Sequence, residues 1–311
     1  MNLKQAWALT KQAITAWSND FAPSMGAALS YYTLFSIAPL LVIVIAIAGF
    51  FFGADAVRGV VFDQLHALMG EEGAEAVRDM LAHASNTTTA GIAAIVSIAG
   101  LVIGATTVFG EIQNDLDRIW RAPALEQGGG IWNLLRTHLL SFGMILGLAF
   151  LLAVSLVVSA ALSMLGKWWD GWLGGWEAVA HGLDIVVNLG LLTVIFALIY
   201  KMIPRVEIGW HDVWVGVGVT AVLFTIGKVL IGLYLGKSDV ASSFGTAGSL
   251  AVLMIWVYYA SQIFLFGAEL TRVYAENHGS RQGDSKERRS SQSKTGRRRN
   301  DGTIAATPQP G

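Results

Sequence analysis

The run from Phe21 to Ala54, which contains no charged residue, constrains the fold more than any other feature of the sequence. A helix needs about 20 apolar residues to cross the hydrocarbon core of a bilayer. Only 14% of the residues are charged, against roughly 25% in an average soluble domain. Windows of suitable length and composition lie near 28–53, 88–110, 138–166, 183–200, 213–235 and 245–268. The sequence therefore predicts an all-α, polytopic membrane protein with six transmembrane helices.

The distribution of Lys and Arg predicts how these helices are oriented, because short cytoplasmic loops are enriched in basic residues. Most of the 21 Lys and Arg fall in the N-terminal segment, the segments after the second and fourth spans, and the C-terminal tail. We therefore expect both termini in the cytoplasm, and the acidic connection 54–89 on the outer side. The first span is too long for a cleaved signal peptide, so we expect it to remain in the protein.

The chain is expected to have two parts that differ in folding. Residues 1–276 hold the six spans, with an N-terminal amphipathic helix that lies at the membrane interface. A soluble cap helix is the alternative for that N-terminal segment. Residues 277–311 are rich in Ser, Gly, Gln, Arg and Pro, and they are expected to form a disordered basic cytoplasmic tail because they can bury little apolar surface.

Two connections are expected to be helical. Residues 56–83 predict one or two short outward helices, broken near Gly70 and Gly73. After the second span, the stretch "GEIQNDLDRIWRAP" continues as an amphipathic helix, and we expect its charged residues, such as Asp115 and Arg118, to be solvated.

Hydroxyl residues occupy one face at the start of the first span. Ser30, Thr33 and Ser36 recur every three residues and cover about 120° of a helix, with Tyr32 at the edge. Pro39 removes a backbone donor, so the helix is expected to kink there. One interpretation is a helix bent around a polar cavity. The other is that the hydroxyls bond back to their own helix and the kink is structural.

The last span has a second polar face. Tyr258, Gln262, Glu269 and Arg272 fall within about 60° of one another on a helical projection. Glu269 and Arg272 can pair because they are three residues apart. These residues could line a substrate path, or the pair could be an ordinary interfacial ion pair.

Lys228 lies inside the fifth span, where a charge needs either a partner or water. The fourth span runs in the opposite direction and places Asn188 at a similar depth, with Asp184 one turn further out. We expect Lys228 to lie against these two residues. The alternative is that the lysine extends to the outer interface.

Residues suited to catalysis are not grouped in the sequence. A metal-dependent nuclease needs clustered His and carboxylate ligands, but His138, His211 and His278 have no ligand-like neighbour at short spacing. Cysteine is absent, and so is the Gly-x-x-x-x-Gly-Lys-Ser/Thr loop that binds ATP phosphates. We expect no enzymatic activity, no catalytic or metal site and no cofactor.

Three stretches occur in an order typical of one family: "AALSYYTLFSIAPLL", "YKMIPRVEIGWHDVWVGV" and "SSFGTAGSLAVLMIWVYYASQIFLFGAEL". Through them the chain resembles the YihY/BrkB family of six-span proteins of the bacterial cytoplasmic (inner) membrane. Phe244 stands where many relatives have Tyr. The residues at family motif positions are Tyr31, Tyr32, Pro39, Tyr200, Pro204, Trp210, Lys228, Tyr258, Gly267 and Glu269.

The resemblance, together with the polar faces, leads to an expectation about function. A carrier or translocation factor for a lipid-like or envelope-related substrate is favoured over a non-transporting structural or envelope-assembly protein. The old family label of ribonuclease is the least favoured. The expected partners are membrane lipids, including an anionic lipid or envelope precursor, and no specific nucleic acid. A homo-oligomer is compatible with the sequence.

Overall fold

A computed structural model of the chain describes residues 3–85, 107–123, 176–237, 243–244 and 247–283, and these residues contain helices but no strand. Residues 107–119 form one helical segment. The other long helices are α1 (Leu3–Asn19), α2 (Ala22–Phe52), α3 (Ala54–Ser85), α6 (Trp176–Met202), α7 (Trp210–Lys237) and α9 (Gly248–His278). The described part of the chain agrees with the predicted all-α class.

Two of the described helices, α7 and α9, are long and apolar enough to cross a membrane. The apolar part of α6, Leu189–Met202, is shorter. The predicted first span lies within α2, which is helical throughout. The predicted spans 88–110 and 138–166 lie almost entirely outside the described residues, so the number of spans and the orientation of the termini stay predictions.

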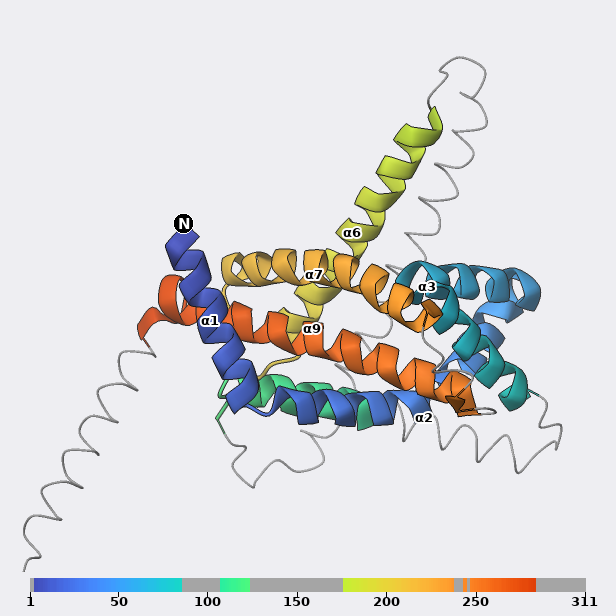
Figure 1. Ribbon diagram of the computed structural model, residues 1–311, viewed down its shortest axis with the longest axis horizontal. Helices are drawn as coiled ribbons and strands as arrows, with labels where there is room; N and C mark the ends of the chain where they lie inside the picture. The colour runs from blue at the N-terminus through green and yellow to red at the C-terminus, as the bar shows by residue number, and fades with distance from the viewer. Residues whose placement is uncertain (1–2, 86–106, 124–175, 238–242, 245–246, 284–311) are drawn as a thin grey trace, which may run out of the picture.

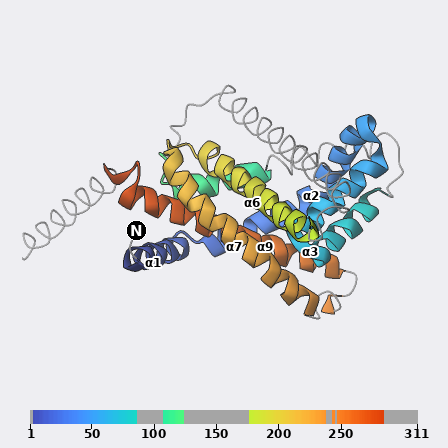
Figure 2. The same ribbon diagram turned by 90° about the horizontal axis from the view of Figure 1, so that it is seen from above.

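Helix α9 is central to the arrangement. It contacts α1, α2, α3 and α7, and Figure 1 shows it lying between α2 and α7, with α1 crossing its C-terminal part. Helix α6 packs on α7, as Figure 2 shows from above. Residues of α9 are therefore buried on several sides of the helix, including both apolar and charged side chains.

Glycines allow α9 to approach α6 and α7 closely. A Cβ atom at Gly216 of α7 would overlap the side chain of Thr271 in α9. A Cβ atom at Gly267 of α9 would overlap Thr220 of α7 and the Tyr200 hydroxyl of α6. Small residues at helix interfaces are typical of membrane proteins, in which helix association depends on close packing more than on the hydrophobic effect.

Helix α1 confirms the predicted N-terminal helix. Its Leu9 and Ala13 are buried against Val273 of α9. Trp7 is 72% exposed and Ile14 is 51% exposed, so the opposite side of α1 is apolar and uncovered by the described residues. The location of α1 at the membrane interface stays a prediction, and this exposed side is the one that would enter the headgroup layer.

The predicted outward connection forms α3, and its predicted break near Gly70 is confirmed. Gly70 has φ 77° and lies between two helical parts of α3. Glycine adopts such a positive φ at little cost because it has no Cβ atom. Helix α3 packs against α2, α7 and α9.

Ordered structure continues past residue 276, where the tail was expected to begin. The Ser280 amide and hydroxyl donate to the Asp212 carboxylate of α7 at 2.8 and 2.6 Å. The Gly209 amide donates to the Ser280 hydroxyl oxygen at 3.2 Å. Asp212 is only 2% exposed, so these bonds satisfy a buried carboxylate. The part of the expected tail at 284–311 lies outside the described residues.

We predict that Gly216→Ala destabilises the protein by about 1–3 kcal/mol, the usual cost of overpacking, because the new methyl group would push α7 away from Thr271. The midpoint of thermal unfolding in lipid nanodiscs should fall. The matched control is Gly218→Ala on the same helix, where the new Cβ atom meets nothing within 4 Å. Equal midpoints for the two variants would contradict the close approach of α7 and α9.

Candidate functional site

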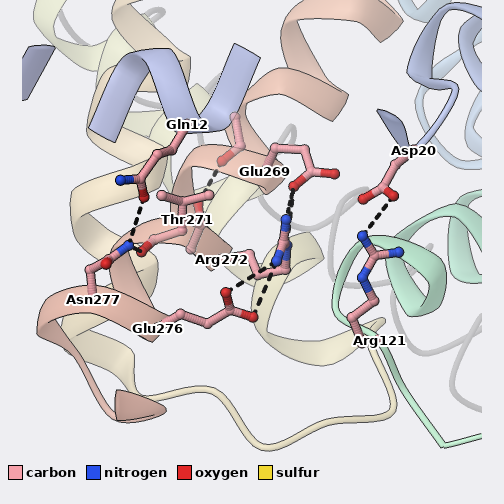
Figure 3. Close-up of polar contacts among 10 residues, drawn as sticks. Gln12, Asp20, Arg121, Glu269, Thr271, Arg272, Glu276 and Asn277 are labelled. Carbon is pink, nitrogen blue, oxygen red and sulfur yellow. Dashed lines mark hydrogen bonds and ion pairs between the residues drawn. The ribbon is translucent and has the colours of Figure 1, made fainter. Parts of the chain in front are cut away.

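Two sets of ion pairs lie near each other where α9, the junction of α1 and α2, and the segment after residue 119 meet (Figure 3). We define the ionic cluster as Asp20, Arg121, Glu269, Arg272 and Glu276. Arg272 donates from Nε and Nη2 to Glu269 Oε2 at 3.1 and 2.8 Å, and from Nη1 to the two Glu276 carboxylate oxygens at 3.1 and 3.2 Å. Arg121 Nη2 donates to Asp20 Oδ1 at 2.7 Å.

Three members of the cluster are buried unusually deeply for charged side chains, while Arg121 and Glu276 are partly exposed. Glu269 is 0% exposed, Asp20 4% and Arg272 8%. Removing charges from water costs several kcal/mol per ion unless other charges and hydrogen bonds compensate. The Glu269–Arg272 pair predicted from its spacing is therefore present, but as an interior ion pair joined to further carboxylates, not as a solvated interfacial pair.

The backbone positions Asp20 at the junction of α1 and α2. The Asp20 amide donates to the Ala16 carbonyl at 2.8 Å in the α-helical pattern, and the Phe21 amide then donates to the Ser18 carbonyl at 3.2 Å, a tighter turn at the end of α1. Phe21 then adopts a left-handed conformation with φ 61°, and a proline in the first turn of α2 favours a new helix start. The chain thus changes direction within one residue, which leaves the Asp20 side chain inside the protein.

Asp20 and Arg121 were not identified from the sequence. They are 101 positions apart, and no local periodicity relates them. One signal was present, because Asp20 is the charged residue directly before the uncharged run that begins at Phe21. A charge at such a boundary could equally be solvated, so the sequence alone does not distinguish a buried carboxylate from a surface one.

The predicted polar face of the first span lies on α2. Ser30 and Ser36 are buried, and each donates to carbonyls of its own helix: Ser30 at 2.9 Å, and Ser36 at 3.0 Å to Tyr32 and 3.3 Å to Thr33. Back-bonding to the helix is thus present for these two hydroxyls. Tyr32 and Thr33 are half-buried. Helix α2 runs through Pro39, whose side chain lies outside the description.

The predicted polar face of the last span meets α2 at Gln262. A Cβ atom on Gly26 of α2 would overlap the Gln262 amide, so this amide lies directly against the α2 backbone. Both Gln262 Nε2 and Oε1 are buried without a hydrogen-bond partner among the described residues. We call this contact between the helices, from Gly26 and Gln262 to Asp20 and Glu269, the α2–α9 seam. Tyr258 is 38% exposed and lies further along α9.

Lys228 is half-buried on α7. It falls on the same helical stripe as the buried side chains of Phe224 and Ile231, so it does not lie on the most exposed face of the helix. The side chains of Asp184 and Asn188, its expected partners, lie outside the described part of α6. The expected contact therefore stays a prediction.

The family motif between α6 and α7 has a structural role here. The Tyr200 hydroxyl donates to the Phe264 carbonyl of α9 at 2.6 Å. Lys201 Nζ donates to the Ile208 carbonyl and lies 5.6 Å from the centroid of the Trp210 ring. These contacts close the connection between α6 and α7 and bind it to α9.

The prediction that the charges of the helix after the second span are solvated is wrong for Asp115, which is 5% exposed. Burial, and secondarily the nearby Glu111, raises the pKa of Asp115 to about 7, while Arg118 opposes this shift. On the same helix, Asp117 pairs with Arg205 at 3.4 Å and attaches the segment to the connection between α6 and α7. Tertiary packing that a single helix does not reveal accounts for this burial.

The chemistry available to the ionic cluster follows from its groups. It contains carboxyl and guanidinium groups, which can hold protons or polar head groups, and no hydroxyl or thiol nucleophile. No group of three or more His, Asp or Glu among the described residues is placed to hold a metal ion. That observation covers the described part of the chain only and does not test the expected absence of activity.

These features define a class, a helical membrane protein with ionisable groups enclosed between its helices. Residues 13–292 match the family described as Virulence factor BrkB, so the chain belongs to this family. The resemblance drawn from the three sequence stretches is confirmed.

Curated relatives agree with this assignment. The UPF0761 membrane proteins of Ralstonia nicotianae and Rhodospirillum centenum are 26% and 27% identical over 86% and 88% of this chain. The chain spans 59% of the length of each. A relative from Tolumonas auensis with the same name is 27% identical, with 83% of this chain and 82% of the relative covered. No solved structure matches. The names describe membrane proteins and specify no enzymatic activity.

The raised pKa of Asp115 predicts a pH dependence of stability. Its ordinary value is 3.8 and its folded value about 7, so between these pH values the folded protein binds the extra proton. Stability should therefore fall as the pH rises from about 4 to 7, by at most about 1.4 kcal/mol per pH unit. Asp115→Asn should reduce this slope in thermal unfolding, whereas Asp63→Asn, at an exposed position of α3, should keep it. An unchanged slope in Asp115→Asn would contradict the shift.

Proposed function

We propose that this protein is a carrier or translocation factor for a lipid-like or envelope-related substrate of the bacterial cytoplasmic membrane, with both termini in the cytoplasm. The observation that carries the proposal is the Gln262 amide, which is buried in the α2–α9 seam with neither its nitrogen nor its oxygen satisfied by the described residues. A polar group of a passing substrate would satisfy it.

The energetic cost of Gln262 favours a functional role over a packing role. An unsatisfied buried donor or acceptor costs about 1–3 kcal/mol. Close packing by glutamine does not offset this cost, because a leucine of nearly the same volume would pack as well without it. A seam that only held α2 and α9 together would be more stable with an apolar residue at this position. Polar residues inside a membrane domain are accordingly functional candidates.

The seam offers more than one polar position along its length. Gln262 and Glu269 are seven residues apart on α9, which corresponds to about 10 Å along the helix axis. The ionic cluster is at the second position, and the polar face of α2 that begins at the buried Ser30 lies on the partner helix. An amphipathic molecule could keep its chains in lipid while its head group contacts these positions in turn.

An anionic substrate is favoured by Lys228, the cation within the predicted fifth span. It lies on the packed side of α7 and could contact a phosphate group of a lipid or envelope precursor. This preference depends on the carrier proposal and is tested separately below.

The second candidate is a non-transporting structural or envelope-assembly protein. Ser30 and Ser36 bond to their own helix, and the Tyr200 hydroxyl joins α6 to α9. Several polar groups thus contribute to packing alone. Gln262 is the residue at which the two candidates differ.

We predict that Gln262→Leu lowers lipid movement at least about tenfold, the equivalent of one lost contact of about 1.4 kcal/mol, while thermal stability is unchanged or raised. The assay uses vesicles of phosphatidylethanolamine and phosphatidylglycerol with fluorescent phosphatidylglycerol, and an impermeant reductant that bleaches the outer leaflet. Met254→Leu, at a position of α9 that is 37% exposed, is the control. Two results would contradict a lipid path along the α2–α9 seam and favour the non-transporting structural protein. In one, wild-type protein moves no more lipid than empty vesicles. In the other, both variants match wild type.

We also predict that Lys228→Met leaves the protein folded but reduces movement of fluorescent phosphatidylglycerol more than movement of fluorescent phosphatidylethanolamine, because the lysine would contact the anionic head group. Lys237→Met, at the exposed end of α7, should change neither rate. Equal losses for the two lipids would exclude a charge-selective role for Lys228.

A further inference from the structure

Two carboxyl oxygens in the ionic cluster have no donor from the described residues. They are Asp20 Oδ2 and Glu269 Oε1, and both are buried. The other oxygen of each carboxyl is held by an arginine: Asp20 Oδ1 by Arg121 and Glu269 Oε2 by Arg272. A buried carboxylate oxygen without a donor costs more than an unsatisfied neutral group.

These two oxygens belong to carboxyls that contact each other, although they come from different elements. The side chains of Asp20 and Glu269 are within hydrogen-bonding contact, and in Figure 3 their free oxygens point toward one another. Two ionised carboxylates are acceptors only and repel each other. Their contact becomes a hydrogen bond when one of them carries a proton.

We propose that Asp20 and Glu269 form a proton-binding site in which one proton is held between Asp20 Oδ2 and Glu269 Oε1. The proposal goes beyond the proposed function and does not depend on it, because the site would bind its proton whether or not the protein moves a lipid.

The charge balance of the cluster supports a single proton. The charged groups facing this contact are Arg272 and Glu276 from α9 and Arg121 from the segment after residue 119. Arg121 and Glu276 are partly exposed, with 41% and 26% of the side chain accessible, so the cost of burial falls on the carboxyls of Asp20 and Glu269. One proton shared between these two carboxyls removes one of the two buried negative charges. Asp212 of α7 is bound to Ser280 instead.

The donor set does not suit a metal cation. Magnesium and calcium take about six to eight oxygen ligands, whereas the contact offers two free oxygens and is flanked by two guanidinium groups. A proton needs only the two oxygens that are present.

The backbone near the contact shows that its geometry is imposed by the fold. Phe21, with φ 61°, and Arg121, with φ 54°, are the non-glycine residues with positive φ among those described. One follows Asp20 directly, and the other is the ion-pair partner of Asp20. Such conformations are unfavourable and persist where the surrounding structure requires them. Their occurrence on both sides of one ion pair indicates a built site.

The test is infrared spectroscopy of the full chain in lipid nanodiscs at neutral pH, in an Asp115→Asn background so that Asp115, with its pKa of about 7, makes no contribution. We expect a carbonyl band of one protonated carboxyl group that shifts on exchange into heavy water. Both Glu269→Gln and Asp20→Asn should abolish this band. Glu276→Gln is the matched control and should retain it, because Glu276 contacts Arg272 on the other side.

Thermal unfolding of the same variants provides the second measurement. Glu269→Gln keeps an oxygen for Arg272 and directs an amide N–H toward Asp20, so it imitates the protonated contact and should unfold at nearly the wild-type temperature. If both carboxyls were instead ionised, this variant would remove a charge partner of Arg272 and lower the unfolding temperature. Three results would each overturn the proposal. They are a missing band in the parent protein, a band retained in both Glu269→Gln and Asp20→Asn, and a band that is lost when sodium replaces potassium in the buffer, as expected if a cation and not a proton occupied the contact.

Discussion

The enclosure of α9 by four other helices is the constraint on which the rest of the described structure depends. Because α1, α2, α3 and α7 all contact it, polar groups on α9 must be satisfied inside the protein. Thr271 donates to the Gly267 carbonyl, the Phe264 carbonyl accepts from Tyr200, and Arg272 is bound by two carboxylates. The same enclosure requires glycine at Gly216 and Gly267, where neighbouring helices come closest. Close packing and the pairing of Arg272 with two carboxylates are thus two consequences of one arrangement.

Sequence patterns over a few residues predicted several helices and one ion pair. The uncharged run gave helix α2, the N-terminal periodicity gave α1, and the glycine at position 70 gave the break in α3. The spacing of Glu269 and Arg272 gave their ion pair. These features depend on residues within about one or two helical turns, for which helical geometry alone determines proximity.

Contacts between distant segments could not be predicted in the same way. Asp20 meets Arg121 and Glu269 only because the junction of α1 and α2, the segment after residue 119 and α9 converge. The sequence indicates that Asp115 lies on the polar side of an amphipathic helix, but it does not indicate that other elements cover that side. Burial of a charge is a property of the assembled helices, so one sequence does not reveal it.

The polar groups of the described helices fall into two kinds, those with a partner in the protein and those without one. Ser30, Ser36 and Tyr200 have protein partners and stabilise packing. Gln262 and the free oxygens of Asp20 and Glu269 have no donor or acceptor from the described chain. These three side chains lie along the seam between α2 and α9, although other buried atoms without a partner, such as Asp115 Oδ2 and Trp256 Nε1, lie elsewhere among the described residues.

The junction at Phe21 has a mechanical consequence. Since only two residues, Asp20 and Phe21, join α1 to α2, the connection is short, and the Asp20 amide is itself bonded to α1. Any tilt of α1 must therefore displace the Asp20 carboxyl relative to α9. The exposed Trp7 side of α1 faces away from α9, so a contact made on that side that tilted α1 would also move a carboxyl inside the protein.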